Sequence, residues 1–234
     1  MASLIVRSIP NTLTCCNLLS GCFATLTAIN SGDFKLALLY IIIGAVFDFF
    51  DGFAARMLHV SSPIGKELDS LADVITFGMA PAAIVWAYLN TCHFPLSIFP
   101  FLMVAFSALR LAKFNLDERQ TSSFIGLPTP ANALFWASLI VGLDEMEDLS
   151  ASICWAVLAG ILISCWLLVA EIPMFALKFK NFNFRDNVVR YLFLFTSLVL
   201  ILLLGVPGIA AVIVWYVILS LLTQHTQQTK HNES

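Results

Sequence analysis

Charged residues are scarce in this chain. Lys, Arg, Asp and Glu make up 12% of its 234 residues, while hydrophobic residues make up 59% and the mean hydropathy is +0.89. A soluble domain carries about 25% charged residues, so this composition excludes a water-soluble fold. It predicts a polytopic membrane protein whose partners include membrane lipids but no nucleic acid.

Cysteine patterns typical of a redox or zinc site are also missing. There are six cysteines, without a Cys-x-x-Cys pair or an accompanying His cluster. We interpret the five that lie in apolar runs as small packing residues; they are Cys15, Cys16, Cys22, Cys154 and Cys165. The N-terminal residues lack the order of basic, apolar and small residues that marks a cleavable signal. We therefore expect the first apolar run to be a permanent span.

Apolar runs close to the length that spans a bilayer recur along the whole chain. A span needs roughly 20 apolar residues. The runs predict about eight transmembrane helices, at residues 12–29, 34–50, 65–88, 96–114, 131–143, 153–174, 189–204 and 209–222. Asn11 is the expected N-cap of the first. The predicted fold class is an all-α polytopic helix bundle, with residues 1–234 forming a single integral membrane domain.

Lys and Arg are distributed unevenly between the segments that join these helices. With a cytoplasmic N-terminus, the outer segments hold Lys35 alone. The inner segments hold the other eleven, which are Arg7, Arg56, Lys66, Arg110, Lys113, Arg119, Lys178, Lys180, Arg185, Arg190 and Lys230. Since positive residues favour the cytoplasmic side, both termini are predicted to be cytoplasmic.

Four aspartates stand at the facing ends of the second and third predicted helices. Asp48 and Asp51 are three residues apart, and Asp69 and Asp73 are four apart, so each pair shares a helix face. Four neighbouring carboxylates repel one another unless cations share the site. Carboxylate oxygens suit Mg²⁺ or Mn²⁺, and two such ions form a clamp for displacement at phosphorus. Solvated charges at helix ends are the simpler alternative, but four together favour a metal site.

The residues around these aspartates complete a specific motif. The pattern Asp48-x2-Asp51-Gly52-x2-Ala55-Arg56-x8-Gly65-x3-Asp69-x3-Asp73 resembles that of the CDP-alcohol phosphatidyltransferases. The resemblance implies an integral membrane enzyme that transfers a phosphatidyl group from a CDP-linked lipid to an alcohol and releases CMP. It also implies a homodimer, a catalytic part at residues 11–143, and additional helices at residues 151–223.

The resemblance also implies roles for individual residues. Asp48, Asp51 and Asp69 would hold the metals, while Asp73 would share one metal and act as the general base. The expected substrate-binding residues are Gly52, Arg56 and Gly65, with Ser62 as a further nucleotide or phosphate contact. Asn11 and Thr14, in Pro10-Asn11-x-x-Thr14, match a family contact to the nucleotide lipid. Packing through small polar residues is an equal alternative for them.

The alcohol is suggested by flanking sequence. Residues 67–82, 110–115 and 124–131 resemble the phosphatidylserine synthase subgroup. This resemblance implies CDP-diacylglycerol and L-serine as substrates, in the cytoplasmic membrane of a bacterium. The Lys and Arg distribution predicts that the active site faces the cytoplasm. Arg110 and Lys113 are candidates for binding the serine carboxylate, or are snorkelling helix-end cations. Alternative acceptors are glycerol 3-phosphate and inositol. A cation-coupled transporter is the alternative of another class, and predicts carboxylates spread along a path through several spans.

Overall fold

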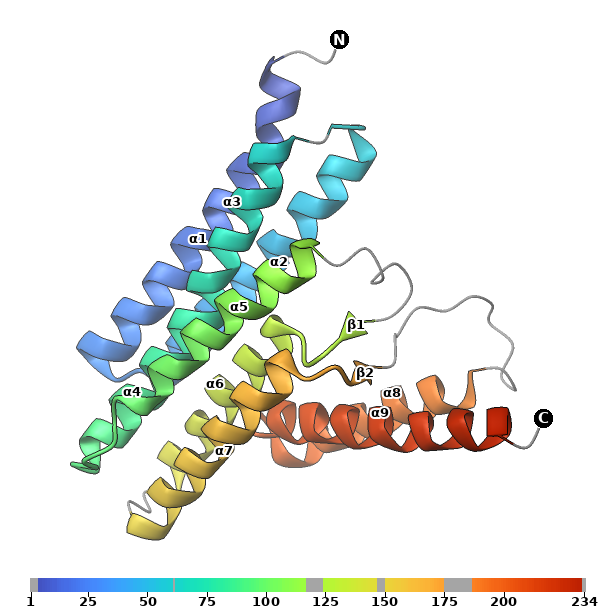
Figure 1. Ribbon diagram of the computed structural model, residues 1–234. Coiled ribbons are helices and arrows are strands. Elements are labelled where there is room, and N and C mark those ends of the chain that lie inside the picture. Colours follow the sequence, from blue (N-terminus) through green and yellow to red (C-terminus); the bar gives the residue numbers. More distant parts are fainter. Residues whose placement is uncertain (1–3, 61, 117–123, 147–149, 175–186, 233–234) are drawn as a thin grey trace.

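The computed structural model describes residues 4–60, 62–116, 124–146, 150–174 and 187–232. These residues are almost entirely helical (Figure 1). The α-helices are α1 (Leu4–Ser31), α2 (Phe34–Met57), α3 (Pro63–Asp73), α4 (Ala80–Thr91), α5 (Leu102–Leu116), α6 (Thr129–Glu145), α7 (Ala151–Val169), α8 (Val188–Leu204) and α9 (Gly208–Asn232). The shorter elements are η1 (Val74–Met79), η2 (Phe99–Phe101), β1 (Phe124–Ile125) and β2 (Pro173–Met174).

The predicted all-α membrane fold is confirmed. Among the described residues, five helical segments are long and apolar enough to cross a membrane; they are 8–31, 34–57, 63–91, 99–116 and 151–169. α8 and the apolar part of α9 are shorter. The counted basic residues Arg119, Lys178, Lys180 and Arg185 lie outside the described residues.

The helices α1 to α7 lie side by side in one bundle, while α8 and α9 run at a steep angle to it (Figure 1). α2 ends and α3 begins at one end of the bundle, which we call the aspartate end. At the opposite end, Lys35 at the start of α2 pairs with Glu145 at the end of α6 at 2.8 Å. Both side chains are exposed, so this ion pair contributes little stability.

Four predicted helix boundaries were wrong. α2 continues to Met57 rather than ending at residue 50, and α9 continues to Asn232 rather than to residue 222, because each helix runs beyond the apolar residues that marked the predicted span. α1 begins at Leu4 and contains Pro10, so Asn11 is not an N-cap. A proline inside a helix removes one backbone bond, here to the carbonyl of residue 6, and the neighbouring bonds carry the helix through. α7 ends at Val169 rather than at residue 174, because the chain turns into β2, which pairs antiparallel with β1.

The third span is a helix with a widened turn in its middle. α3, η1 and α4 follow one another without a break, and η1 is a π-helix. Pro81 follows this segment; a proline ring clashes with the preceding turn of a regular α-helix, and a wider turn relieves that clash. π-Helical turns are frequent at functional sites, and this one begins directly after Asp73.

α9 packs along α6 over most of the length of that helix. A Cβ on Gly142, near the end of α6, would lie 2.6 Å from the ring of Pro207, which just precedes α9. Leu127, just before α6, clusters with Tyr216 and Leu219 of α9. α9 and the residue before it therefore meet α6 near both of its ends, in spite of the tilt of α9.

Candidate metal and nucleotide-lipid site

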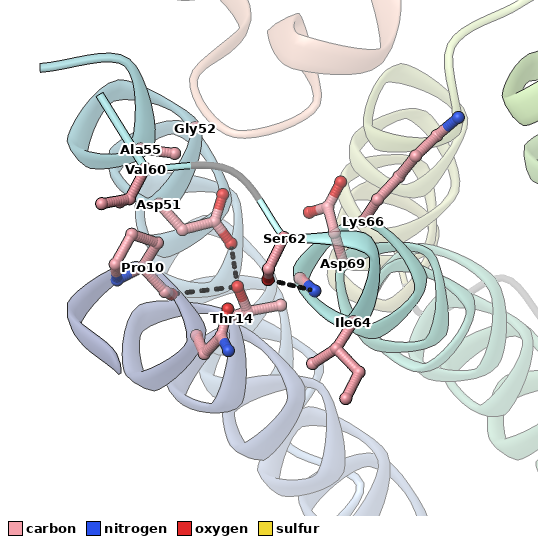
Figure 2. Close-up of a pocket in the computed structure, with 12 residues that line it drawn as sticks. Pro10, Thr14, Asp51, Gly52, Ala55, Val60, Ser62, Ile64, Lys66 and Asp69 are labelled. Carbon is pink, nitrogen blue, oxygen red and sulfur yellow. Dashed lines mark hydrogen bonds between the residues drawn. The ribbon is translucent and has the colours of Figure 1, made fainter. Parts of the chain in front are cut away.

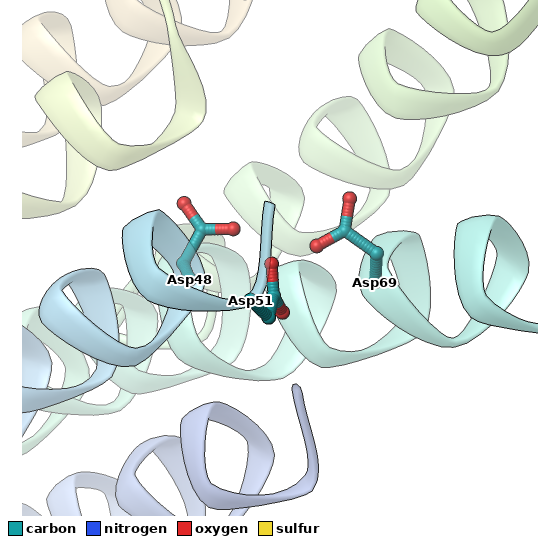
Figure 3. Close-up of side chains that lie close together, drawn as sticks. All are labelled: Asp48, Asp51 and Asp69. Carbon is teal, nitrogen blue, oxygen red and sulfur yellow. The ribbon is translucent and has the colours of Figure 1, made fainter. Parts of the chain in front are cut away.

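Three of the four motif aspartates converge on one point. Ligand oxygens of Asp48 and Asp51 from α2 and of Asp69 from α3 all lie within 4.8 Å of one another (Figure 3). Asp51 is buried and the other two are half-buried. The buried Oδ1 of Asp69 has no hydrogen-bond partner among the described residues. Three converging carboxylates with an unsatisfied oxygen fit a hard divalent cation.

Asp73 lies one helical turn beyond Asp69 and outside this group of three. It is 8% exposed, and its Oδ1 accepts a hydrogen bond from the Asn17 amide nitrogen at 3.2 Å. It remains close enough to Asp48 and Asp69 for electrostatic interaction. The structure therefore separates a three-carboxylate centre from a deeper fourth carboxylate.

A pocket of about 450 Å³ opens beside the carboxylates, between α1, α2 and α3 (Figure 2). Of the predicted substrate-binding residues, Asn11, Thr14, Gly52, Ser62 and Gly65 all line it. Asp51, Asp69 and Lys66 line it too, together with the apolar Pro10, Ala55, Val60 and Ile64. The pocket thus combines acidic groups, one cation and an apolar wall.

Two of these residues also have structural partners. The Thr14 hydroxyl donates to Asp51 Oδ2 at 2.6 Å and also lies 3.0 Å from the Pro10 carbonyl oxygen (Figure 2). Ser62 is the N-cap of α3, where its hydroxyl accepts from the Gly65 amide at 2.9 Å. A hydroxyl oxygen has two lone pairs, so capping leaves Ser62 able to contact a ligand.

The two motif glycines, Gly52 and Gly65, have different roles in the packing of the helices. A Cβ on Gly65 would lie 3.0 Å from both Asn11 Oδ1 and Ser62 Oγ, which is tight. A Cβ on Gly52 would meet only the Arg56 guanidinium, at an ordinary 3.6 Å. Gly65 thus lets α1 and α3 approach each other, while Gly52 leaves space in the pocket. Arg56 is exposed beside Gly52.

Comparisons with known proteins agree with this geometry. The family model described as CDP-alcohol phosphatidyltransferase matches residues 7–222. The chain belongs to the CDP-alcohol phosphatidyltransferase family. Its motif occupies two elements, because α2 supplies the first five positions and α3 supplies Gly65, Asp69 and Asp73.

Three family relatives illustrate the range of similarity. The CDP-diacylglycerol–serine O-phosphatidyltransferase of Bacillus subtilis is 42% identical over 40% of this chain and 54% of its own length. The enzyme of the same name from Mycobacterium leprae is 27% identical over 97% and 76%. The archaetidylserine synthase of Methanothermobacter thermautotrophicus is 31% identical over 67% of each. The chain spans about half the length of the first curated relatives that it matches.

The two predicted carboxylate-binding cations of this family member differ in environment. Arg110 on α5 is 8% exposed, and its Nε has no hydrogen-bond partner within the described part of the chain. It interacts electrostatically with Asp73 and with Tyr216 of α9. Lys113, three residues on, is exposed. A snorkelling anchor at a helix end is exposed, as Lys113 is, whereas Arg110 is buried.

Three residues near the site lie outside the predicted set of site residues. Asn17 contacts Asp73, Lys66 lines the pocket, and Tyr216 lies near Arg110. In the sequence, Asn17 is an amide within an apolar run, which is only a weak indication of a role at the site. Lys66 lies between two motif residues and donates to the Asn115 carbonyl at 3.0 Å. Tyr216 is 106 residues from Arg110 in sequence, and no local pattern joins them.

Proposed function

We propose that the protein transfers a phosphatidyl group from CDP-diacylglycerol to the hydroxyl of L-serine, giving phosphatidylserine and CMP. The observation that carries the proposal is the three-carboxylate centre, of which Asp51 and Asp69 line a pocket, in a chain of this family. Serine as the acceptor is supported by the relatives, whose names specify serine although they differ in the lipid.

Asp48, Asp51 and Asp69 would hold Mg²⁺ or Mn²⁺, and Asp73 would share a second ion. When bound, the cations supply charge neutralisation for the diphosphate and for the leaving CMP. Thr14 holds the Asp51 carboxylate by its hydrogen bond, which limits the orientations that this carboxylate can adopt. Such outer partners of metal ligands contribute strongly to metal affinity.

The pocket would hold the nucleotide part of the lipid. Gly52 leaves room for the cytidine diphosphate, and Asn11 of α1 offers polar atoms in the pocket wall. Lys66 and Arg56 are the cations nearest these residues and would bind phosphate oxygens. The apolar lining residues, among them Ile64, would contact the start of the acyl chains.

The acceptor would approach from the side of Asp73. Asp73 takes the proton from the serine hydroxyl as the oxygen attacks the phosphorus that bears the diacylglycerol. A serine oxygen–phosphorus bond forms, the bond to the CMP oxygen breaks, and CMP leaves. Arg110 would hold the serine carboxylate with two parallel hydrogen bonds, a geometry that suits a guanidinium.

One assay tests the reaction and the acceptor together. Purified protein is mixed with CDP-diacylglycerol and labelled serine, glycerol 3-phosphate or inositol, and CMP release is measured. We expect release with serine alone. Release with another alcohol would correct the acceptor, and no release with any of them would refute the enzyme. A transporter is not favoured, because the buried carboxylates among the described residues are Asp51 and Asp73, both at the aspartate end.

For the membrane, we propose eight spans in the cytoplasmic membrane of a bacterium, with both termini and the aspartate end facing the cytoplasm. The packing of Pro207 on Gly142 supports α8 and α9 as spans, because it places their turn near the end opposite the aspartates. Reporters inserted after Glu145 and after Val206 should be external, and one at Asn187 cytoplasmic. A cytoplasmic reporter at Val206 would reduce the number of spans to six.

We also propose that residues 11–143 form the catalytic part and that residues 151–223 add helices that support it. The position of Tyr216 near Arg110 supports a contact between the added helices and the proposed acceptor site. A homodimer is proposed from the family resemblance. Light scattering on the purified protein, corrected for detergent, would contradict it by giving the mass of a single chain.

A further inference from the structure

Asn17 lies at the centre of the contact between α1 and the Asp73 segment. We propose that Asn17 is a positioning residue: its amide holds the carboxylate of Asp73 in the orientation in which Asp73 removes the proton from the acceptor. The inference rests on the proposed function and extends it to a residue outside the family motif.

The contact itself is a buried polar hydrogen bond. Asn17 Nδ2 donates to Asp73 Oδ1 at 3.2 Å, and the two residues are 0% and 8% exposed. The direction of the amide follows from charge, because a flipped amide would place its oxygen against a carboxylate oxygen. Because the Asn17 amide holds Oδ1, the carboxylate of Asp73 cannot rotate freely, and its Oδ2 keeps one direction. A general base must point toward the proton that it removes.

The Asn17 backbone is locked to the same segment. The Thr76 hydroxyl donates to the Asn17 carbonyl at 2.9 Å. Thr76 belongs to the π-helical η1, three residues after Asp73. Asn17 of α1 is therefore hydrogen-bonded both to Asp73, just before η1, and to Thr76 within it. The position of Asn17 relative to Asp73 is therefore set by two bonds rather than one.

Two glycines make this approach possible. A Cβ on Gly21 of α1 would lie 2.5 Å from Thr76 Oγ1 and 2.6 Å from Thr76 Cα. A Cβ on Gly44 of α2 would lie 2.5 Å from Thr76 Cγ2 and 3.0 Å from Asn17 Oδ1. Helices α1 and α2 thus approach η1 closely around Thr76 and Asn17, and this packing restricts the side chain that holds Asp73.

A purely structural role does not explain an amide at this position. Asn17 Oδ1 is buried and has no hydrogen-bond partner among the described residues. An unsatisfied buried acceptor is unfavourable, and a leucine of similar size would avoid it. The amide is therefore explained by its donor, which faces Asp73.

The test compares Asn17→Leu and Asn17→Ser with the control Ser20→Ala. Ser20 is also buried on α1, but its hydroxyl donates to the backbone carbonyl of Cys16 at 2.9 Å. For both Asn17 variants we expect kcat to fall at least about tenfold, since small misplacements of a reacting group cost up to about a hundredfold. The KM values for serine and CDP-diacylglycerol and the half-saturating Mg²⁺ concentration should stay within about threefold of wild type.

Several results would overturn the inference. One is a kcat of the Asn17 variants equal to that of Ser20→Ala. Another is a rise in the KM for the CDP-lipid, or in the Mg²⁺ requirement, together with the loss of kcat. A third is failure of both Asn17 variants to fold, as judged by circular dichroism and size exclusion. The last would make Asn17 structural. The wild-type assay comes first: without CMP release from CDP-diacylglycerol and serine, the proposed function fails before any variant is compared.

Discussion

Arg110 allows the proposed acceptor site to be tested by a single substitution. The guanidinium is 8% exposed, so folding has already removed most of its water. Its Nε has no partner in the described part of the structure, and its electrostatic neighbours are Asp73 and Tyr216. A serine carboxylate would therefore meet a cation that is already desolvated and held beside the base.

The expected magnitude follows from the bond that is lost. A hydrogen bond to a charged group contributes about 1.5–3 kcal/mol, and each 1.4 kcal/mol is about a factor of ten. Arg110→Gln retains one neutral donor, so we expect the serine KM to rise at least about tenfold and at most on the order of a hundredfold. The KM for CDP-diacylglycerol should change by less than about twofold, because Arg110 does not line the nucleotide pocket.

Lys113→Gln is the matched control, since it removes a cation from the same helix end but from an exposed position. The acceptor can also be changed instead of the protein. Serinamide keeps the hydroxyl and the amine but lacks the carboxylate. Wild type should prefer serine over serinamide at least about tenfold, and Arg110→Gln should lose that preference.

Steady-state CMP release in mixed micelles gives all of these constants. The reasoning is refuted if Arg110→Gln and Lys113→Gln have the same serine KM, or if Arg110→Gln still discriminates against serinamide. Either result would make Arg110 a membrane anchor, and the carboxylate would be held elsewhere, for example by Lys66.

Three further predictions concern the aspartates and the packing behind them. Asp69→Asn should abolish CMP release, and a chelator should do the same to wild type until Mg²⁺ or Mn²⁺ is added; full activity in chelator would exclude the metal centre. Asp73→Asn should lower kcat by a factor on the order of 100 while CDP-lipid binding survives better than in Asp69→Asn, and equal loss of lipid binding in both would make Asp73 a metal ligand first. Gly21→Ala should lower the melting temperature measured in detergent, because its Cβ would lie 2.6 Å from Thr76 Cα; unchanged melting would show that α1 can shift freely.

The cluster of three carboxylates was predictable because the motif residues lie close together in sequence. Asp48 and Asp51 share one helix, and Asp69 follows after a short connection. Helical spacing then brings all three together, and the structure confirms their convergence. Ser62 also had a local signal, since Ser followed by Pro63 is typical of an N-cap and first helical position.

The sequence was less informative about helix boundaries and about contacts between distant segments. Pro10 resembled a helix start, and nothing local showed that the turn before it would be helical. The end of α7 was predictable in principle, because the residue before Pro173 disfavours helix. The pairs Asn17–Asp73 and Arg110–Tyr216 join separate helices, so only the packing of the bundle reveals them.

These contacts give α1 a role that its sequence alone did not fix. All four motif aspartates come from α2 and α3, yet two of them are oriented by α1: Thr14 bonds to Asp51, and Asn17 bonds to Asp73. Thr14 and Asn17 are three residues apart and share one face of α1. Asp51 belongs to the carboxylate centre and Asp73 is the proposed base, so successive turns of one helix hold the two parts of the site. Under the proposed function, this rigid helix would fix the separation between the metal-binding carboxylates and the base, and in-line transfer at phosphorus requires a fixed separation between the attacking oxygen and the bound diphosphate.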